Sequence, residues 1–319
     1  MTVLRVDPWD PDFGSSIETE EDPDRPPPPV EFDEPVPWTA ISPEPPAELP
    51  CYAFVDGVRR VDLHLFAEDG DVVAPAMAGS WAVGAAWTGQ APQIADVRVR
   101  RVIVVGNGLD HPPIAVTIGG HTMEFAAQSA PVRTPRELLL RLQTAMRNDE
   151  ASLSEVIAER GEADLIVQDG PLTYSGRGRS PAIGLIKRQT QRYLDPERQR
   201  LLGELQVGER TPLFRFESRE LPRYSWYARI ATPRLIDGKM AGLVRLEVGA
   251  GQDLITARRL AGLTAATLPA YAAPMWRDSR SPQNLYPVGQ LETVLRNWLG
   301  ERDLVRRALE SALWDTVHA

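Results

Sequence analysis

The chain has 319 residues, of which 43% are hydrophobic and 25% charged, and its formal net charge is −9. This length can bury a sizeable core in one large or two modest domains, and the composition is that of a soluble globular protein. No apolar run approaches the ~18 residues that span a bilayer, so we do not expect a membrane protein. The single cysteine, Cys51, excludes an internal disulfide framework and a multi-cysteine zinc site, and it suits a cytoplasmic location.

Residues 1–49 differ in composition from the rest of the chain. The first 50 residues hold thirteen Asp/Glu, two Arg and thirteen of the 29 prolines, which leaves residues 51–319 with a net charge of +2. The run Pro26–Pro29 forms neither a helix nor a central strand. We therefore predict a tail at 1–49, either a solvated linker or a docking strip with aromatic anchors, and a folded domain at 50–319. A near-neutral, arginine-rich domain permits nucleic-acid binding, although a GC-rich genome produces the same arginine bias.

From residue 51 the pattern changes to short apolar and alternating runs. These predict strands at 52–57, 61–66, 79–88, 97–105, 114–118 and 121–125. The last two are joined by Gly119-Gly120, a two-residue hairpin signal. The segment is therefore predicted to be a block of consecutive antiparallel strands.

A helix is predicted to follow, because Thr134-Pro135-Arg136-Glu137 combines a capping threonine, proline at the first helical position and an early acid. Its apolar positions keep helical spacing as far as Ile157. Asp149 falls within the apolar face and Glu150 on its margin, whereas Glu155 points the opposite way. A carboxylate on the buried side of a helix is costly unless it is paired or binds a metal, so Asp149 and Glu150 stand out.

The remainder of the chain alternates between strand and helix patterns. Strands are predicted at 163–172, 182–187, 214–216, 224–230 and 243–248, and helices at 253–268, 288–299 and 302–316. The predicted class is an α/β fold with a mixed sheet flanked by helices and a C-terminal helical segment.

Asp56 and Asp169 are the most informative pair. Each follows an apolar strand-like run and precedes a glycine, which lets the chain turn and a ligand approach closely. With Glu150 or Asp149, three acids could converge, and such all-oxygen clusters bind Mg²⁺ or Mn²⁺. Two such ions activate water and stabilise the leaving oxygen of a phosphodiester. Asp-Gly is also common at turns, so two unrelated turn aspartates are the alternative.

Seven blocks, in order over about residues 50–300, resemble the NurA family of nucleases. They are FVDGVRR (54–60), DLIVQDGPL (164–172), AIGLIK (182–187), GERTPLF (208–214), SWYAR (225–229), VRLEV (244–248) and NLYP (284–287). The resemblance implies an RNase H-like fold and Mn²⁺-dependent (or Mg²⁺-dependent) cleavage of single- and double-stranded DNA with 5′ end preference. It also implies a homodimer that works with a HerA-type hexameric ATPase in DNA end resection or antiviral defence.

The resemblance also assigns residue roles. The family's metal-binding acids fall on Asp56, Glu150 and Asp169, with Asp149 as the alternative to Glu150, and its C-terminal tyrosine falls on Tyr286, which would position DNA. The family's histidine, about eight residues later, is replaced by Val294. The alternative to a nuclease is therefore a weakly active or inactive DNA-binding or assembly subunit of a translocase complex. A third possibility is an RNA-directed enzyme with the same acidic cluster.

Basic residues near these motifs are candidates for DNA contacts. They are Arg59, Arg60, Arg177, Arg179, Lys187 and Arg188, each of which suits a backbone phosphate and is equally compatible with an ordinary surface role.

Overall fold

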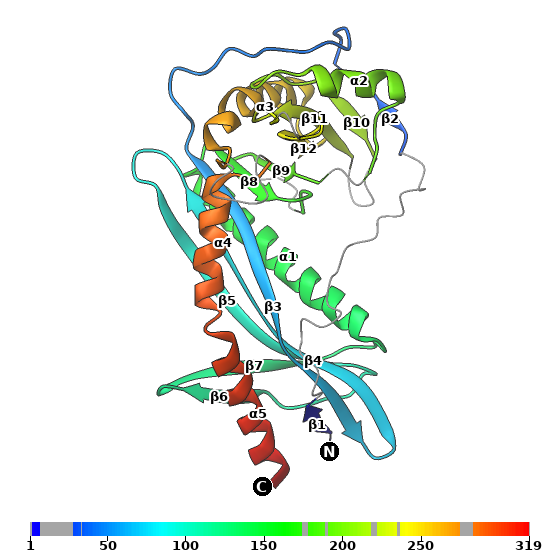
Figure 1. The fold of residues 1–319 in the computed structure, drawn as a ribbon, viewed down its shortest axis with the longest axis vertical. Coiled ribbons are helices and arrows are strands. Elements are labelled where there is room, and N and C mark those ends of the chain that lie inside the picture. The colour runs from blue at the N-terminus through cyan, green and yellow to red at the C-terminus, as the bar shows by residue number, and fades with distance from the viewer. Residues whose placement is uncertain are drawn as a thin grey trace.

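The computed structural model describes residues 2–6, 28–32, 34–173, 178–188, 191–217, 222–234, 237–274 and 283–318. The described strands form one twelve-stranded mixed sheet (Figure 1). The strands are β1 (Val3–Val6), β2 (Val30–Glu31), β3 (Tyr52–Asp69), β4 (Val72–Trp87), β5 (Gln93–Val105), β6 (Ile114–Ile118), β7 (His121–Ser129), β8 (Leu165–Asp169), β9 (Ala182–Ile186), β10 (Phe214–Phe216), β11 (Arg223–Arg229) and β12 (Leu243–Gly249). The helices are α1 (Pro135–Arg160), α2 (Pro196–Glu204), α3 (Leu254–Thr267), the 3₁₀ turn η1 (Leu268–Tyr271), α4 (Tyr286–Trp298) and α5 (Arg302–His318).

Strand β3 lies in the middle of the sheet. On one side β4 and β5 follow it in antiparallel order, and on the other β8 and β9 run parallel to it. Beyond β9 the sheet continues with β12, β11, β10 and β2, each antiparallel to its neighbour. The predicted α/β class with a mixed sheet is confirmed.

The two strands predicted at 52–57 and 61–66 are one continuous strand, β3, so this prediction was wrong. A register shift between Val61 and Leu63 marks a bulge at Asp62. The buried carboxylate of Asp62 accepts hydrogen bonds from Nε of Arg60 at 2.7 Å and from Oγ of Ser80 at 2.5 Å. These hydrogen bonds compensate the burial of the Asp62 carboxylate, so the strand continues through the polar residues at which the sequence predicted a break.

Helices cover both faces of this central region. Helix α1 begins at the predicted residue, with the capping box of Thr134 and Glu137 formed, and packs its apolar face on β3, β4 and β8. Helices α3 and α4 cover the opposite face, where Leu291 and Leu295 join the core cluster that includes Phe54. Among the described helices, none has both the length and the hydropathy that a bilayer crossing requires.

A second packing unit lies at the far end of the long strands. The predicted hairpin of β6 and β7 is confirmed, with positive φ angles of 56° and 82° at Gly119 and Gly120. Strand β7 runs parallel to β5, so the prediction of an entirely antiparallel block was wrong. Helix α5 packs here, and Leu309 lies in the same buried cluster as Leu65 and Phe125 (Figure 1).

Parts of the first 49 residues pack on the folded domain. Strand β1 pairs with β3 and β2 pairs with β10, although neither strand was predicted. Glu34 is buried and forms ion pairs with Arg210 at 3.0 Å and Arg258 at 3.0 Å. Two of the aromatic residues expected to act as anchors, Trp9 and Phe13, lie outside the described residues. Helix α2 was also missed, although Asp195 caps it immediately before a proline.

Candidate metal centre

Asp56 and Asp169 lie side by side because their strands are parallel neighbours. Val55 pairs with Gln168 in the register of β3 and β8, which brings the next residue of each strand together. Asp169 ends β8, as the sequence predicts, whereas Asp56 lies within the long strand β3 at the level where β8 stops. The two aspartates therefore lie side by side at the level where β8 ends.

A third carboxylate reaches this point from α4. One carboxylate oxygen each from Asp56, Asp169 and Glu292 lie within 4.8 Å of one another. Asp56 and Glu292 are buried and Asp169 is half-buried. Glu292 was not among the predicted site residues, although it lies between Val288 and Leu295 on the apolar face of its helix. An acid in that stripe is the same signal that identified Asp149 and Glu150.

Glu150 approaches the same strand from the opposite helix. A Cβ atom on Gly57 would lie 2.6 Å from Oε1 of Glu150, so the missing side chain of Gly57 makes room for this carboxylate. Glu150 is buried but does not belong to the group of three acids that meet within 4.8 Å. Asp149 turns elsewhere, because its Oδ2 accepts a hydrogen bond of 2.7 Å from the indole of Trp81.

Lys187 connects the acids to the neighbouring strand. Its Nζ donates to Oδ2 of Asp169 at 2.6 Å and to Oδ1 of the buried Asn284 at 2.6 Å. Lys187 directly follows β9, which pairs in parallel with β8, so the ends of these two strands place Lys187 beside Asp169. One ammonium group thus partly compensates the carboxylates.

Burial and mutual repulsion act on the protonation of these acids. Burial raises the pKa of Asp56 well above its ordinary value, and Asp169, Glu150 and Glu292 add to the shift while Lys187 opposes it. Burial also raises the pKa of Glu150 to about 8, with Arg147 opposing the shift and Asp169 adding to it. A bound divalent cation would relieve both effects, because it favours the charged carboxylates. The all-oxygen donor set fits a hard cation such as Mg²⁺ or Mn²⁺.

The predicted DNA-binding residues divide into two groups. Arg59 donates to the side chain of Gln143, and Arg60 donates to the carbonyls of Leu299 and Gly300 at the end of α4, so both are engaged within the protein. Arg188 is exposed. The backbone N–H of Arg179 donates to Ala158, and Arg177 lies outside the described residues.

Two positions on α4 complete the predicted site. Tyr286 begins the helix with 36% of its surface exposed, and its ring centre lies 6.0 Å from that of Tyr271. Val294, which replaces the family's histidine, is half-buried two residues after Glu292.

Comparison of the sequence with known protein families identifies one that matches this chain. The family model of the NurA domain matches residues 110–294, which is more than half of the chain. The match includes Glu150, Asp169, Lys187 and Glu292 and begins after Asp56. No curated protein matches the chain. The NurA family is nuclease-related and is associated with DNA and with HerA in general. The chain belongs to the NurA family.

Proposed function

We propose that the protein is a metal-dependent DNA nuclease that processes DNA ends together with a HerA-type hexameric ATPase. The observation that carries this proposal is the meeting of Asp56, Asp169 and Glu292 within 4.8 Å in a chain of the NurA family. Three carboxylates at this distance repel one another strongly unless a cation joins them. Lys187, 2.6 Å from Asp169, and Arg296, 2.9 Å from Glu292, offset part of the cost of burying these acids, and a divalent cation shared by all three would offset more of it.

The strand order supports an RNase H-like core. Strands β5, β4 and β3 form three antiparallel strands, and β8 and β9 extend them in parallel after the crossover helix α1. A core of this kind brings an acid on its central strand beside one at the end of the next parallel strand, as Asp56 and Asp169 are arranged here.

Asp56, Asp169 and Glu292 would hold the cation, and Glu150, close to Gly57, would hold a second one or stabilise the first. When bound, Mn²⁺ or Mg²⁺ would supply an activated water and neutralise the charge that develops on the phosphate. Lys187 would orient Asp169 and contact the phosphate of the strand being cut. Tyr286 and Arg188, both exposed near this edge, would hold the DNA.

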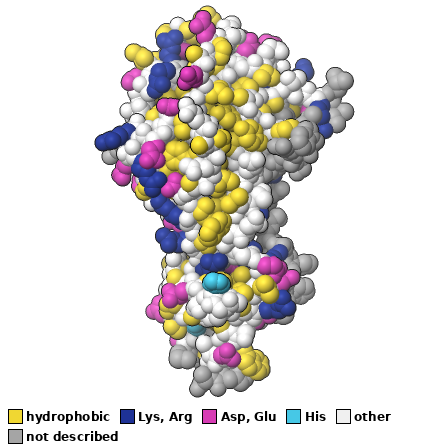
Figure 2. Space-filling model, turned by 90° about the vertical axis from the view of Figure 1, so that its left-hand side faces the viewer, with side chains coloured by type: hydrophobic (Ala, Val, Ile, Leu, Met, Phe, Trp, Pro, Cys, Tyr) yellow, Lys and Arg dark blue, Asp and Glu magenta, His cyan; other side chains and the backbone are white. Residues whose placement is uncertain are grey.

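Apolar side chains on the surface support partner binding. Helices α4 and α5 expose Trp298, Leu304 and Trp314, with 59%, 45% and 66% of their surfaces accessible. Figure 2 shows hydrophobic side chains gathered along one face of the molecule, with Lys and Arg mainly at its edge. A homodimer and a HerA-type ATPase are the partners we propose for such surfaces.

The second candidate is a DNA-binding or assembly subunit with weak or no activity. The observation that favours it is Val294, because the missing imidazole would remove a phosphate contact or a proton donor worth roughly 10²–10⁴-fold in rate. Glu292 adds a carboxylate to the acid cluster and favours the enzyme.

The test is cleavage of linear DNA by the purified protein, with and without the ATPase, in Mn²⁺, Mg²⁺ or EDTA. We expect Asp56→Asn and Glu292→Gln each to lower the Mn²⁺-dependent rate at least 100-fold, because each removes a charged ligand. Asp71→Asn, in the exposed turn between β3 and β4, is the matched control and should cut normally. Unchanged cleavage by folded Asp56→Asn would refute the assignment. DNA retention without any product would favour the assembly subunit, and preferential cleavage of a competing RNA would favour an RNA-directed enzyme.

A further inference from the structure

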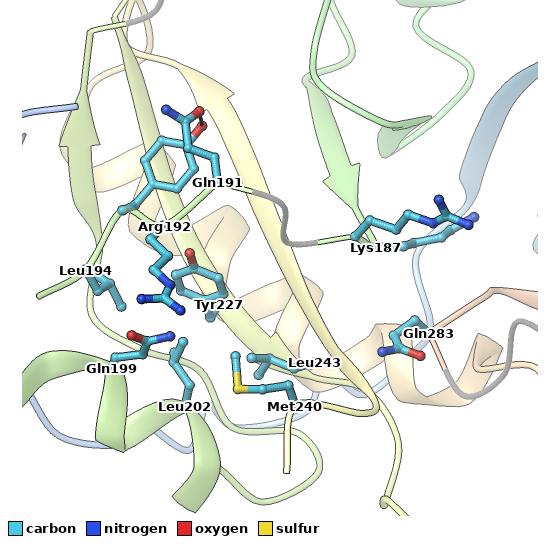
Figure 3. A pocket seen from close by; sticks show the side chains of 12 residues that line it. Lys187, Gln191, Arg192, Leu194, Gln199, Leu202, Tyr227, Met240, Leu243 and Gln283 are labelled. Atoms are coloured by element: carbon cyan, nitrogen blue, oxygen red, sulfur yellow. Dashed lines mark hydrogen bonds between the residues drawn. The ribbon is translucent and has the colours of Figure 1, made fainter. Parts of the chain in front are cut away.

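A cavity of about 550 Å³ lies beside the metal centre, bounded by β11, the start of β12, α2 and the residues after β9. Lys187 belongs to both, since it lines the cavity and contacts Asp169 at 2.6 Å. In Figure 3, Lys187 and Gln283 lie at one end, and Arg192 and Gln199 lie near Tyr227 at the other. The cavity therefore extends away from the acids as a continuation of the same site.

The lining combines three kinds of chemistry. Leu202, Tyr227, Met240 and Leu243 provide an apolar and aromatic wall. Glutamine amides add hydrogen-bond donors and acceptors, and three cations, Lys187, Arg188 and Arg192, complete the set, with no acid among the described lining residues. The phosphates of a nucleotide suit the cations, the face of its base suits the apolar wall, and the edge of its base suits the amides.

We propose that this cavity binds one unpaired nucleotide of the strand being cut. The proposal rests on the proposed nuclease function, because Lys187 would then hold the phosphate between the cavity and the metal centre. The volume lies within the ~300–1,000 Å³ typical of small-ligand pockets. A base that enters such a pocket has left its partner, so the enzyme would act on single strands or frayed ends and cut fully paired DNA slowly.

The first experiment places one abasic nucleotide at successive positions of a single-stranded oligonucleotide and measures the cleavage rate in Mn²⁺. We expect a loss of about 5- to 150-fold at one position next to the cut, which corresponds to ~1–3 kcal/mol for one base. Arg192→Gln should slow cleavage of the intact oligonucleotide and flatten this profile. Arg200→Gln is the control, because Arg200 lies on the same stretch of chain but outside the cavity. It removes an equal charge and should leave both the cleavage rate and the position-dependent profile unchanged. A flat profile in the unmodified protein, or equal effects of the two variants, would overturn the proposal.

The second experiment does not depend on cleavage, so it separates this proposal from the nuclease assignment. A single-stranded oligonucleotide with 2-aminopurine at the sensitive position, or at each position in turn if no cleavage is found, is titrated with the Asp56→Asn variant. We expect its fluorescence to change on binding, and Arg192→Gln to weaken this binding at least 5-fold relative to Arg200→Gln. Free dTMP should compete only at millimolar concentration. Tight binding of dTMP that leaves oligonucleotide binding unaffected would instead indicate a site for a free nucleotide and would overturn the proposal.

Discussion

At the scale of single residues, Glu150 couples the candidate site to protein stability. Its pKa is raised to about 8 in the folded protein, above the ordinary value of 4.5. The folded state therefore binds more protons than the unfolded state between these values, so stability falls as the pH rises through this window. Asp56 acts in the same direction, because burial, with repulsion from the neighbouring acids, raises its pKa as well.

We expect the metal-free protein in EDTA to be less stable at pH 8.5 than at pH 5.5, with Glu150 responsible for about 3 kcal/mol of the difference. Glu150→Gln should reduce this slope, since its amide does not titrate, and Mn²⁺ should restore the stability of the unmodified protein at pH 8.5. Urea unfolding at several pH values measures the effect. Glu155→Gln, on the exposed side of α1, is the control, and an equal slope in both variants would contradict the argument.

The sequence identified the strand acids better than the helix acids. Asp56 and Asp169 stood out because apolar runs and glycines flank both, and β-pairing then brought them together. Helix spacing alone favoured Asp149 over Glu150, yet Asp149 bonds Trp81 and Glu150 is buried near Gly57. A shift of one residue turns a helix by about 100°, so the helical period could not separate two adjacent acids without knowing where β3 and β4 lie.

At the scale of elements, Glu34 binds the N-terminal segment to the folded domain through ion pairs and a backbone hydrogen bond. Its carboxylate pairs with Arg210 and Arg258 and accepts the backbone N–H of Leu213 at 2.7 Å. The pKa of Glu34 is lowered although burial acts to raise it, because the arginines and the backbone hydrogen bond outweigh burial. The stability that this cluster supplies is present at neutral pH and is lost as the pH falls through the folded pKa.

We expect Glu34→Ala to lower the free energy of unfolding by about 3–5 kcal/mol at pH 7, because Arg210 would remain buried without its carboxylate. The loss should shrink at pH 3, where Glu34 is more protonated in the unmodified protein. Glu31→Ala removes an exposed partner of Arg215 at 3.9 Å and should cost less than about 1 kcal/mol. Urea unfolding of both variants measures these changes. Similar losses of unfolding free energy in the two variants would contradict a stabilising role for the Glu34 ion pairs.

Elements with a local signal were predicted well, whereas elements that depend on distant partners were missed. The capping box of α1 and the glycine pair between β6 and β7 lie within a few residues, and both were confirmed. Strands β1 and β2 have only four and two residues and exist because β3 and β10 offer edges to pair with. The parallel pairing of β7 with β5 likewise depends on tertiary packing and left no local pattern.

At the scale of the whole molecule, charge is distributed unevenly. The first 50 residues carry a net −11 and the rest carries +2, so the body as a whole attracts DNA weakly. Much of its arginine is also engaged internally. Arg229, for example, donates to four backbone carbonyls, and Arg245 pairs with the buried Glu247 at 2.7 Å. We therefore expect DNA binding to depend on local groups of cations, and Lys187, Arg188 and Arg192 form one such group because they line one cavity.

This distribution leads to a prediction for salt dependence. Three phosphate contacts on single-stranded DNA release counterions with a slope of about −2 for log K against log salt, from ~0.7 per contact. We therefore expect affinity for a short oligonucleotide to fall about 15-fold as salt rises from 50 to 200 mM, measured by fluorescence anisotropy with the Asp56→Asn variant. Arg188→Gln should make the slope shallower by about 0.7, whereas Arg200→Gln should leave it nearly unchanged, because screening removes distant charges from the interaction. A salt-independent affinity would mean that contacts other than ion pairs hold the DNA. Equal slopes in the two variants would mean that the DNA phosphates do not contact the cations of this cavity.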